Sequence, residues 1–166
     1  MKYRTLAIAM VSLVSVVLTA LVAAGCSRDS GGTGVEIKPT WIAAQVEGEQ
    51  VSISRSEIDD GQMVHFRVEE QGQKMVFMAY PLGEEIHLRA SICPPCRSES
   101  FSLVGDTLVC NACGTRFQAA TGDGISGACK NYPKAEAAHA VVGDKMTASV
   151  TDLVAAYQNT KTAGRP

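Results

Sequence analysis

The stretch CPPCRSESFSLVGDTLVCNACG, residues 93–114, contains two C-x-x-C pairs and the segment that joins them. The pairs are Cys93/Cys96 and Cys110/Cys113, and thirteen residues separate them. Each pair places two sulfur atoms at the tip of a tight turn, and the segment between the pairs has the right length for a hairpin. Four thiolates would then converge on one point, as a tetrahedral metal ion or a small iron–sulfur cluster requires. The stretch therefore predicts a metal site.

The N-terminus has the pattern of an export signal. A short basic start is followed by a nearly continuous apolar run, residues 6–22, and then by Ala23-Ala24-Gly25 before Cys26. Small residues directly before a cysteine resemble the lipobox of bacterial lipoproteins, and this resemblance implies cleavage before Cys26 and lipid attachment to it. An uncleaved anchor helix is the alternative, because a mostly apolar run of seventeen residues nearly spans a thin bilayer. Both interpretations place the remaining chain outside the cytoplasm, beside a membrane.

The charge of the chain excludes one class of partner. The sequence has 15 basic and 17 acidic residues, and two of the basic residues lie in the predicted signal. The part after the signal is therefore net acidic and has no basic run or stripe, which argues against a nucleic-acid partner and against an electrostatic membrane patch.

The cysteine count favours a metal site over disulfide bonds. Of the six cysteines, five remain if Cys26 carries lipid, so a pure disulfide framework would leave one thiol unpaired. A thioredoxin-type pair normally opens a helix, whereas the residues after Cys96 have the pattern of a strand. Neither pair is followed by histidine, which excludes covalently attached c-type haem. Structural disulfides and a redox thiol pair remain as alternatives to the metal.

The identity of the metal stays open at the level of residues. The spacing of the four cysteines favours a closed structural zinc site, whose metal would supply local folding free energy. The signal segment has no twin arginine, so the chain is expected to cross the membrane unfolded and without a preassembled cluster. An iron–sulfur cluster assembled after export fits the same four cysteines.

The rest of the chain predicts a mostly β domain built of hairpins, with a short helix at its end. We expect Thr151 to be the N-cap of that helix, which ends near Gln158. The glycine-rich segment 122–127 is expected to be a loop. The expected strands are 51–53, 63–68, 75–80, 85–92, 101–104, 107–109, 139–142 and 145–150.

The fifth cysteine, Cys129, has two possible roles. It could be a further metal ligand, or it could line the site without binding metal. We favour the lining role, since two C-x-x-C pairs already complete a tetrahedral set. The glycines at 122, 124 and 127 would allow residues 126–130 to pass close to the cysteine pairs.

Other candidate ligands are weaker. We interpret His65 and His139 as core or surface residues, and we expect His87 to face solvent because it alternates with apolar neighbours. Methionines in the strand segments are interpreted as core residues. The sequence contains no set of residues typical of a hydrolytic or nucleotide-binding site, so we do not expect an enzyme.

Residues of about 50–150 resemble the FtrD-like family of membrane-associated iron–sulfur proteins. The resemblance rests on three stretches around and before the cysteines: residues 51–54, residues 64–66 with 75–77, and above all the run Leu108–Phe117. Residues 127–133, GACKNYP, are similar to the family's Gly-Gly-Cys-Asn-Pro element. The resemblance implies an iron–sulfur cofactor and electron supply in a membrane redox or iron-transport system. Relatives with a multi-span membrane half differ from this chain, in which we expect only the exported domain on a lipid anchor.

A looser similarity is to Rieske domains, whose second cluster loop resembles residues 108–117. Here cysteines stand where a Rieske protein has histidines. The change argues against a true Rieske centre, since two imidazole ligands raise its reduction potential. An all-cysteine centre is expected to have a lower potential.

Together these observations predict a lipoprotein signal peptide at 1–25, the lipidated Cys26 with a flexible linker at 26–34, and a metal-binding β domain at 35–166. The fold is expected to be all-β, with a Rieske-like or ribbon-like two-sheet arrangement. Cys93, Cys96, Cys110 and Cys113 hold the cofactor, and the function is electron transfer to a membrane redox or transport protein. The alternatives are a lipoprotein whose zinc ribbon is a binding or scaffold module, and a thiol–disulfide redox protein.

The anchor generates the first testable prediction. Cys26→Ser should abolish lipid attachment, because the thiol is the acylation site. The variant should leave the membrane fraction or keep its signal, and the mass of the protein should change accordingly. Ser30→Ala, in the same predicted linker, serves as the control and should behave like the wild type. Unchanged fractionation and mass of the Cys26→Ser protein would exclude the lipoprotein interpretation.

Overall fold

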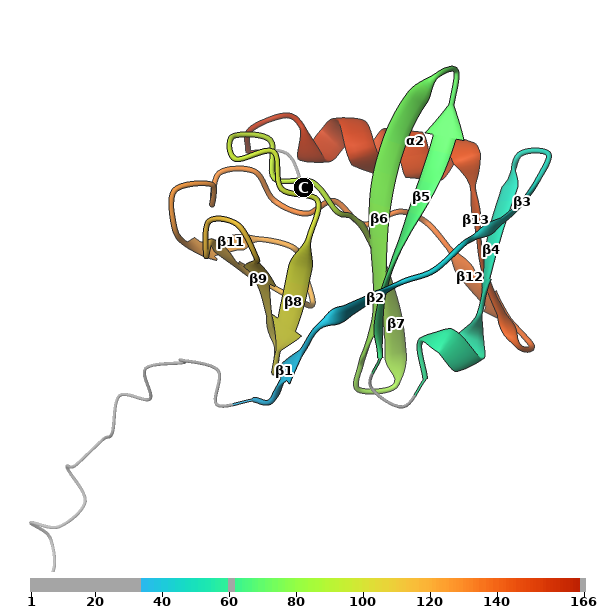
Figure 1. Cartoon of the computed structure of the whole chain (residues 1–166), viewed down its shortest axis with the longest axis horizontal. Coiled ribbons are helices and arrows are strands. Elements are labelled where there is room, and N and C mark those ends of the chain that lie inside the picture. The colour runs from blue at the N-terminus through green and yellow to red at the C-terminus, as the bar shows by residue number, and fades with distance from the viewer. Residues whose placement is uncertain (1–33, 60–61, 165–166) are drawn as a thin grey trace, which may run out of the picture. The chain divides into compact units, whose positions relative to one another are not determined.

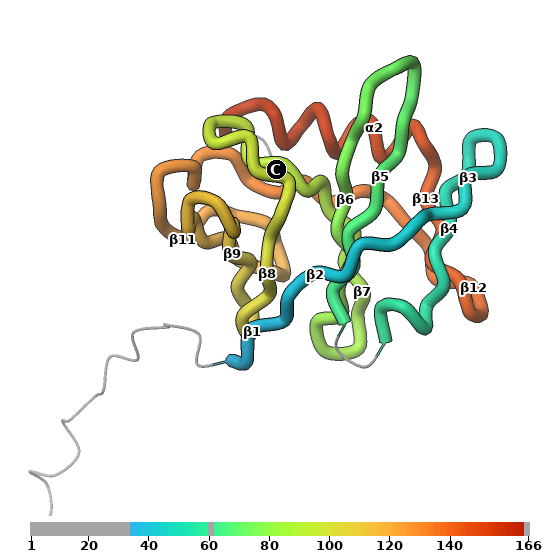
Figure 2. Tube along the Cα trace, in the orientation of Figure 1, coloured from blue at the N-terminus to red at the C-terminus, as the bar shows by residue number. Residues whose placement is uncertain are grey.

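The computed structural model describes residues 34–59 and 62–164 (Figures 1 and 2). The predicted signal peptide, Cys26 and all of the predicted linker except Gly34 lie outside the described residues. The elements in chain order are β1(Glu36–Ile37), β2(Pro39–Trp41), β3(Gln45–Glu47), β4(Gln50–Ser54), the 3-10 helix η1(Arg55–Glu57), β5(Met63–Glu70), β6(Gln73–Leu82), β7(Glu85–Ala90), β8(Phe101–Val104), β9(Thr107–Cys110), β10(Arg116–Gln118), β11(Gly124–Ser126), β12(Ala140–Val142), β13(Lys145–Ser149) and α2(Val150–Thr160).

The central sheet has the strand order β2-β5-β6-β7 and is built around one hairpin. Strands β5 and β6 pair in antiparallel register, with Phe66 opposite Phe77. The two residues between them, Gln71 and Gly72, have φ angles of 52° and 78°. Two consecutive positive φ angles are typical of a type I′ turn, whose twist matches that of the paired strands. The hairpin predicted from the sequence is therefore confirmed.

One face of the central sheet packs against a second sheet and the helix. Alternate residues of β5 and β6 point to this face, among them Phe66, Phe77 and Met75, and all are buried. The opposing layer consists of the sheet β12-β13-β4-β3 and α2, which contributes Leu153 and Tyr157. Figure 1 shows the helix alongside this part of the domain. This hydrophobic core contains none of the cysteines of the described residues.

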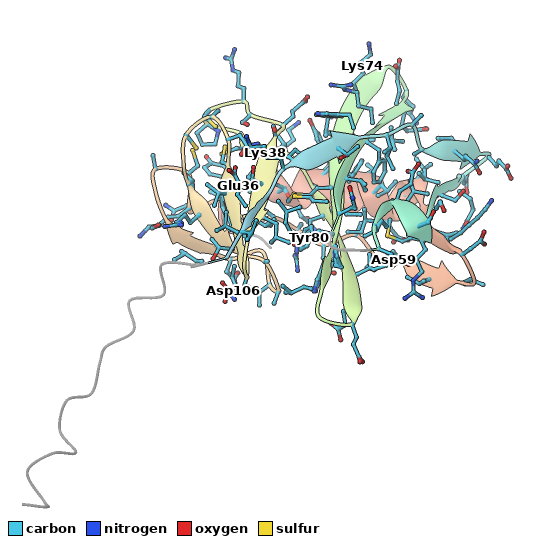
Figure 3. All side chains as sticks on the ribbon, turned by 60° about the horizontal axis from the view of Figure 1, so that its bottom comes forward. Glu36, Lys38, Asp59, Lys74, Tyr80 and Asp106 are labelled. Carbon is cyan, nitrogen blue, oxygen red and sulfur yellow. The ribbon has the colours of Figure 1, made fainter. Side chains whose placement is uncertain are left out.

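The other face of the central sheet packs against the strands that carry the cysteines. Met78 and Tyr80 point to this side, so the middle of β6 is buried on both faces. Figure 3 shows the Tyr80 side chain in the interior of the domain. The opposing layer is the sheet β1-β8-β9-β10-β11, here called the cysteine sheet, with Phe101 and Phe117 in contact at a ring distance of 6.0 Å. This second core also contains Cys93, Cys110 and Cys129.

The prediction of an all-β hairpin fold with one C-terminal helix is confirmed, and three details differ. The described residues form three sheets instead of two, because β6 buries both of its faces and each face needs its own covering layer. The glycine-rich segment contains strand β11, which pairs with β10. The helix begins at Val150, since the Oγ atom of Ser149 accepts a hydrogen bond from the Asp152 N–H at 3.0 Å and caps it.

The expectation that His87 faces solvent is wrong. Its exposed fraction is 8%, its ring is stacked on Tyr80, and its Nδ1 atom lies 2.9 Å from Oε1 of Glu136. The reason is that the segment after the glycine-rich region runs along β7, where the N–H of Ala137 donates to the carbonyl of Leu88. A segment distant in the sequence thus covers the face that alternation assigned to solvent.

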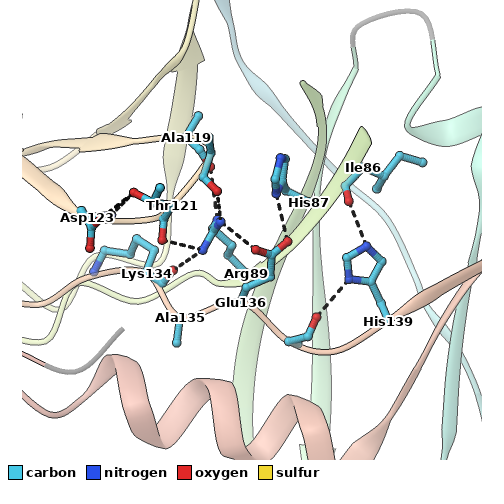
Figure 4. Close-up of polar contacts among 12 residues, drawn as sticks. Ile86, His87, Arg89, Ala119, Thr121, Asp123, Lys134, Ala135, Glu136 and His139 are labelled. Carbon is cyan, nitrogen blue, oxygen red and sulfur yellow. Dashed lines mark hydrogen bonds and ion pairs between the residues drawn. The ribbon is translucent and has the colours of Figure 1, made fainter. Parts of the chain in front are cut away.

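A buried arginine joins the cysteine sheet to the central sheet (Figure 4). The guanidinium group of Arg89, on β7, donates to Tyr80 Oη at 3.0 Å and to an oxygen of Glu136 at 2.8 Å. It also donates to four backbone carbonyls, those of Ala119, Ala120, Thr121 and Lys134. These carbonyls belong to two segments that follow the second cysteine pair. Arg89 therefore holds the segments beside the cysteines in a fixed position.

No helix within the described ranges has the length and apolar character needed to cross a bilayer.

The Arg89 network generates the second prediction. Arg89→Met should lower the free energy of unfolding by about 3–5 kcal/mol, because it leaves several buried carbonyls and the Glu136 carboxylate without their donor. Urea unfolding measures this change. The matched control is Arg55→Met, since Arg55 forms only an exposed ion pair with Asp59. The control should change stability by about 1 kcal/mol or less. Equal stability of the two variants would refute the assigned role of Arg89.

Candidate metal centre

The first cysteine pair lies in a loop between β7 and β8, here called the first knuckle, residues 93–98. The N–H of Cys93 donates to the carbonyl of Ser98 at 2.7 Å, which closes the base of the loop. The N–H of Arg97 donates to the carbonyl of Cys93, also at 2.7 Å. The loop therefore folds back so tightly that both of its sulfurs are presented at one end. Pro94 and Pro95 restrict the backbone between them.

The second pair lies in a matching loop between β9 and β10, the second knuckle, residues 110–115. The N–H of Cys110 donates to the carbonyl of Thr115, and the N–H of Gly114 donates to the carbonyl of Cys110, both at 2.9 Å. These are the same two hydrogen bonds, at the same sequence spacing, as in the first knuckle. The two loops are therefore copies of one local structure.

Each knuckle has a residue with a positive φ angle four positions after its first cysteine. Gly114 has φ of 70°, which glycine adopts without steric cost. The corresponding residue of the first knuckle, Arg97, has φ of 59°, a conformation that costs a non-glycine residue about 1–2 kcal/mol. Sequence analysis missed Arg97, although its equal spacing from the first cysteine could have indicated it.

The knuckles bring the four paired cysteines together. The sulfurs of Cys93, Cys96, Cys110 and Cys113, here called the cysteine centre, all lie within 4.8 Å of one another. The sulfurs of Cys96 and Cys110, from different knuckles, are 3.7 Å apart. All five cysteines of the described residues are free thiols. The convergence expected from the spacing of the pairs is therefore present.

The donor set fits a metal or an iron–sulfur centre. Four thiols and no competing carboxylate form the set, which is the chemistry that zinc, iron and iron–sulfur clusters prefer. With metal–sulfur bonds of about 2.3 Å, the sulfurs of a tetrahedral site lie about 3.8 Å apart. The observed separation of 3.7 Å is close to this value. A cluster with two irons would need the sulfurs of the two irons further apart, because bridging sulfides lie between them.

The thiols of the cysteine centre differ in acidity. A hydrogen bond to Cys110 raises the pKa of Cys93, and the same interaction lowers the pKa of Cys110 to about 4. The backbone N–H groups of Cys113 and Ala112 also lower the pKa of Cys110. Burial raises the pKa of Cys96 to about 11. These shifts favour the thiolate form of Cys110 and the protonated forms of Cys93 and Cys96, and metal binding requires all of them to be deprotonated.

Cys129 lies beside the centre without joining the set of mutually close sulfurs. Its sulfur is 3.8 Å from that of Cys113, and its N–H donates to Oγ1 of Thr115 at 3.2 Å. The same Thr115 oxygen lies 3.2 Å from the Cys113 sulfur. A Cβ atom on Gly127 would lie 2.7 Å from the Thr115 backbone, so only glycine allows this approach. Gly127 thus acts as expected, while the lining role of Cys129 stays a prediction.

A lysine that sequence analysis did not select completes the surroundings of the centre. Lys134 is fully buried, and its ammonium group donates to the carbonyl of Ile92 at 2.7 Å. The same group lies over the rings of Phe117 and Phe101, at 4.5 and 5.4 Å. Burial lowers its pKa to about 8, against the opposing influence of the nearby cysteines. Nothing in the local pattern around Lys134 signals its burial.

The remaining candidates lie away from the cysteine centre. His65 is buried beside Trp41 and Ser91, and desolvation lowers its pKa to about 4, so it is neutral at physiological pH. His139 is held between the carbonyls of Ala137 and Ile86. The methionines of β5 and β6 are core residues, in agreement with their interpretation from the sequence.

Comparison with known proteins agrees with this geometry. Residues 58–159 match the family described as "Membrane iron-sulfur containing protein FtrD-like". No curated protein matches the sequence.

Among solved structures, a chain from the complex of reduced oxygenase and oxidized ferredoxin in carbazole 1,9a-dioxygenase has a TM-score of 0.52 and 19% identity. The match covers 63% of this chain and 95% of that one. The ferredoxin of Sphingomonas yanoikuyae B1 has a TM-score of 0.48 and 16% identity, over 58% of this chain and 92% of that one. The first match supports the Rieske-like fold class, and at this identity it shows the fold alone.

The centre generates the third prediction. Cys110→Ser should lose the metal and loosen the hairpin of β8 and β9, because metal binding and local folding are coupled. Cys129→Ser, the matched comparison, should keep the metal at the wild-type stoichiometry, since four other sulfurs already form a complete set. Elemental analysis of the two anaerobically purified proteins gives both values.

Two outcomes would contradict this prediction. Full metal content and an unchanged melting temperature of Cys110→Ser would exclude the four-sulfur site. Equal metal losses in the two variants would show that Cys129 is a ligand.

Proposed function

The chain belongs to the FtrD-like family of membrane iron–sulfur proteins, and from that premise we propose that it is an electron-transfer protein and not an enzyme. In this proposal Cys93, Cys96, Cys110 and Cys113 hold the redox centre. The centre, when bound, supplies one-electron chemistry at a potential set by its ligands and surroundings. The protein supplies four thiolates, a dry inner side and an accessible outer side.

One observation carries the proposal, namely the change in burial across the cysteine centre. Cys93 and Cys110 are fully buried, whereas Cys113 is exposed at the surface of the domain. The inner side packs against Phe101 and Phe117, which exclude water from it. A partner that docks at the exposed side would come close to a ligand of the centre while the rest of the centre stays protected.

The location of the partner follows from the family and from the N-terminus. The family is one of membrane proteins, which supports a partner at a membrane. We propose that lipid at Cys26 tethers the exported domain beside that partner, a membrane redox or iron-transport protein. The linker at 26–34 would let the domain move between the electron donor and acceptor.

The separation of the sulfurs supports a second candidate. The separation of 3.7 Å between the Cys96 and Cys110 sulfurs is close to the value for a single tetrahedral ion, and all four sulfurs lie within 4.8 Å of one another. If that ion is Zn²⁺, which has no redox chemistry, the domain is a lipoprotein scaffold with a structural metal. A single iron in the same position would retain the electron-transfer function.

The fourth prediction distinguishes these candidates. The full chain, extracted in detergent and purified without oxygen, should contain iron and show visible sulfur-to-iron charge-transfer bands. Dithionite should bleach these bands, and a mild oxidant should restore them, because the centre exchanges electrons reversibly. Absorption spectroscopy and elemental analysis of one sample give the answer.

Colourless protein with one zinc per chain would refute electron transfer and support the scaffold. Metal-free protein whose thiols cycle with a disulfide would instead support the thiol–disulfide alternative. The Cys110→Ser protein, prepared in parallel, is the control for iron bound elsewhere on the chain.

A further inference from the structure

Among the residues that the structure describes, Lys134 is a buried cation without a carboxylate partner. Its exposed fraction is 0%, and none of the salt bridges among the described residues includes it. Its ammonium group makes one hydrogen bond, to the carbonyl of Ile92, and faces two aromatic rings. The neighbouring buried cation, Arg89, differs in having the Glu136 carboxylate at 2.8 Å. Lys134 therefore requires its compensating charge from another source.

Burial of the Lys134 ammonium group has a large free-energy cost. Removal of an ammonium group from water is costly even after the protein relaxes, unless an opposite charge lies nearby. A single carbonyl and two ring faces offset only part of this cost, since a cation–π contact is weak by comparison. An apolar side chain of similar length would fill the same space without the charge. Packing against Phe101 and Phe117 therefore does not explain why this side chain is charged.

The cysteine centre shares a core with the two aromatic rings that lie next to the Lys134 ammonium group. The carbonyl that receives its hydrogen bond belongs to Ile92, directly before Cys93. The charges of Cys93, Cys110, Cys129 and Cys96 all favour the protonated form of the lysine. Four thiolates around a divalent ion carry a net charge of about −2, which exceeds the single positive charge of Lys134.

We propose that Lys134 is the internal counter-charge of the four-cysteine centre. Its ammonium group stabilises the metal-loaded site and favours the more negative of the centre's two redox states. This inference rests on the proposed function, because it needs a metal bound by Cys93, Cys96, Cys110 and Cys113.

The redox consequence has a definite sign. Reduction adds one electron from the donor to the centre and therefore one negative charge, while no bond to Lys134 forms or breaks. A fixed buried cation stabilises the reduced state more than the oxidised state, because Coulomb interactions are strong where water is excluded. Lys134 therefore raises the reduction potential, and its loss lowers it. An all-cysteine centre otherwise has a low potential.

The first measurement is metal affinity in the full chain. We expect Lys134→Met to bind Co²⁺ at least tenfold more weakly than the wild type, as followed by the visible bands of tetrahedral Co²⁺–thiolate. Lys134→Gln, which removes the charge and keeps a hydrogen-bond donor, should show the same loss. Lys130→Met is the matched control, since it removes a lysine from the same loop at an exposed position. The control should bind Co²⁺ as the wild type does.

The second measurement separates charge compensation from packing. Without metal, the Lys134→Met protein should unfold in urea at the wild-type midpoint or above it, because the metal-free site compensates the buried charge much less than the loaded centre does. With metal, it should be the less stable of the two. The proposal would be overturned if the metal-free Lys134→Met protein were unfolded or less stable than the wild type while its folded fraction bound Co²⁺ with unchanged affinity. That result would show that Lys134 has a structural role only.

The third measurement is the reduction potential of the iron-loaded protein. A tenfold loss of preference for the reduced state corresponds to about 59 mV for a one-electron couple, and the Lys134→Met protein should shift downward by at least this amount. An unchanged or higher potential would overturn the proposal. Failure of the wild type itself to bind metal would refute the proposed function, whereas equal binding by wild type and Lys134→Met would refute only the role of Lys134.

Discussion

Burial of both faces of β6 connects the cysteine centre to the rest of the fold. One face of the strand, with Met75 and Phe77, belongs to the core under the helix. The other face, with Met78 and Tyr80, belongs to the core that contains Cys93 and Cys110. A strand between two cores cannot shift its register, because a slip of one residue would exchange the two sets of side chains. The position of the knuckles is therefore fixed by packing some distance away from them.

Buried charge is the second constraint on the site. Arg89 and Lys134 enter the same part of the interior, and the carbonyl of Lys134 accepts a hydrogen bond from Arg89 (Figure 4). Arg89 is compensated by Glu136 and by backbone oxygens, so it acts as a structural cation. The Lys134 ammonium group is not part of this network. It donates to the carbonyl of Ile92, the residue directly before Cys93. One segment thus carries both a fixed structural link and a charge next to the centre.

The two knuckles could be predicted from the sequence because the same C-x-x-C pattern occurs twice. Two C-x-x-C pairs, each followed at equal spacing by a residue with positive φ, form two copies of the same loop. Glycine occupies this position in the second knuckle, at Gly114. Arg97 occupies it in the first knuckle, so the residue type there does not indicate a positive φ angle. The alternation of apolar and polar residues correctly predicted strands β5 and β6, but it wrongly predicted that His87 faces solvent. The error arose because alternation describes a strand alone and not the segment that later covers it.

The sequence by itself determined the features that depend on neighbours along the chain: the hairpins, the terminal helix, the two knuckles and the convergence of four sulfurs. These follow from turn chemistry, alternation and the spacing of the cysteines. Only the tertiary structure decided that there are three sheets and that Arg89 and Lys134 are buried. Which distant segment covers a charged side chain depends on how the sheets pack, and a lysine in a loop has the same local pattern whether it is exposed or buried.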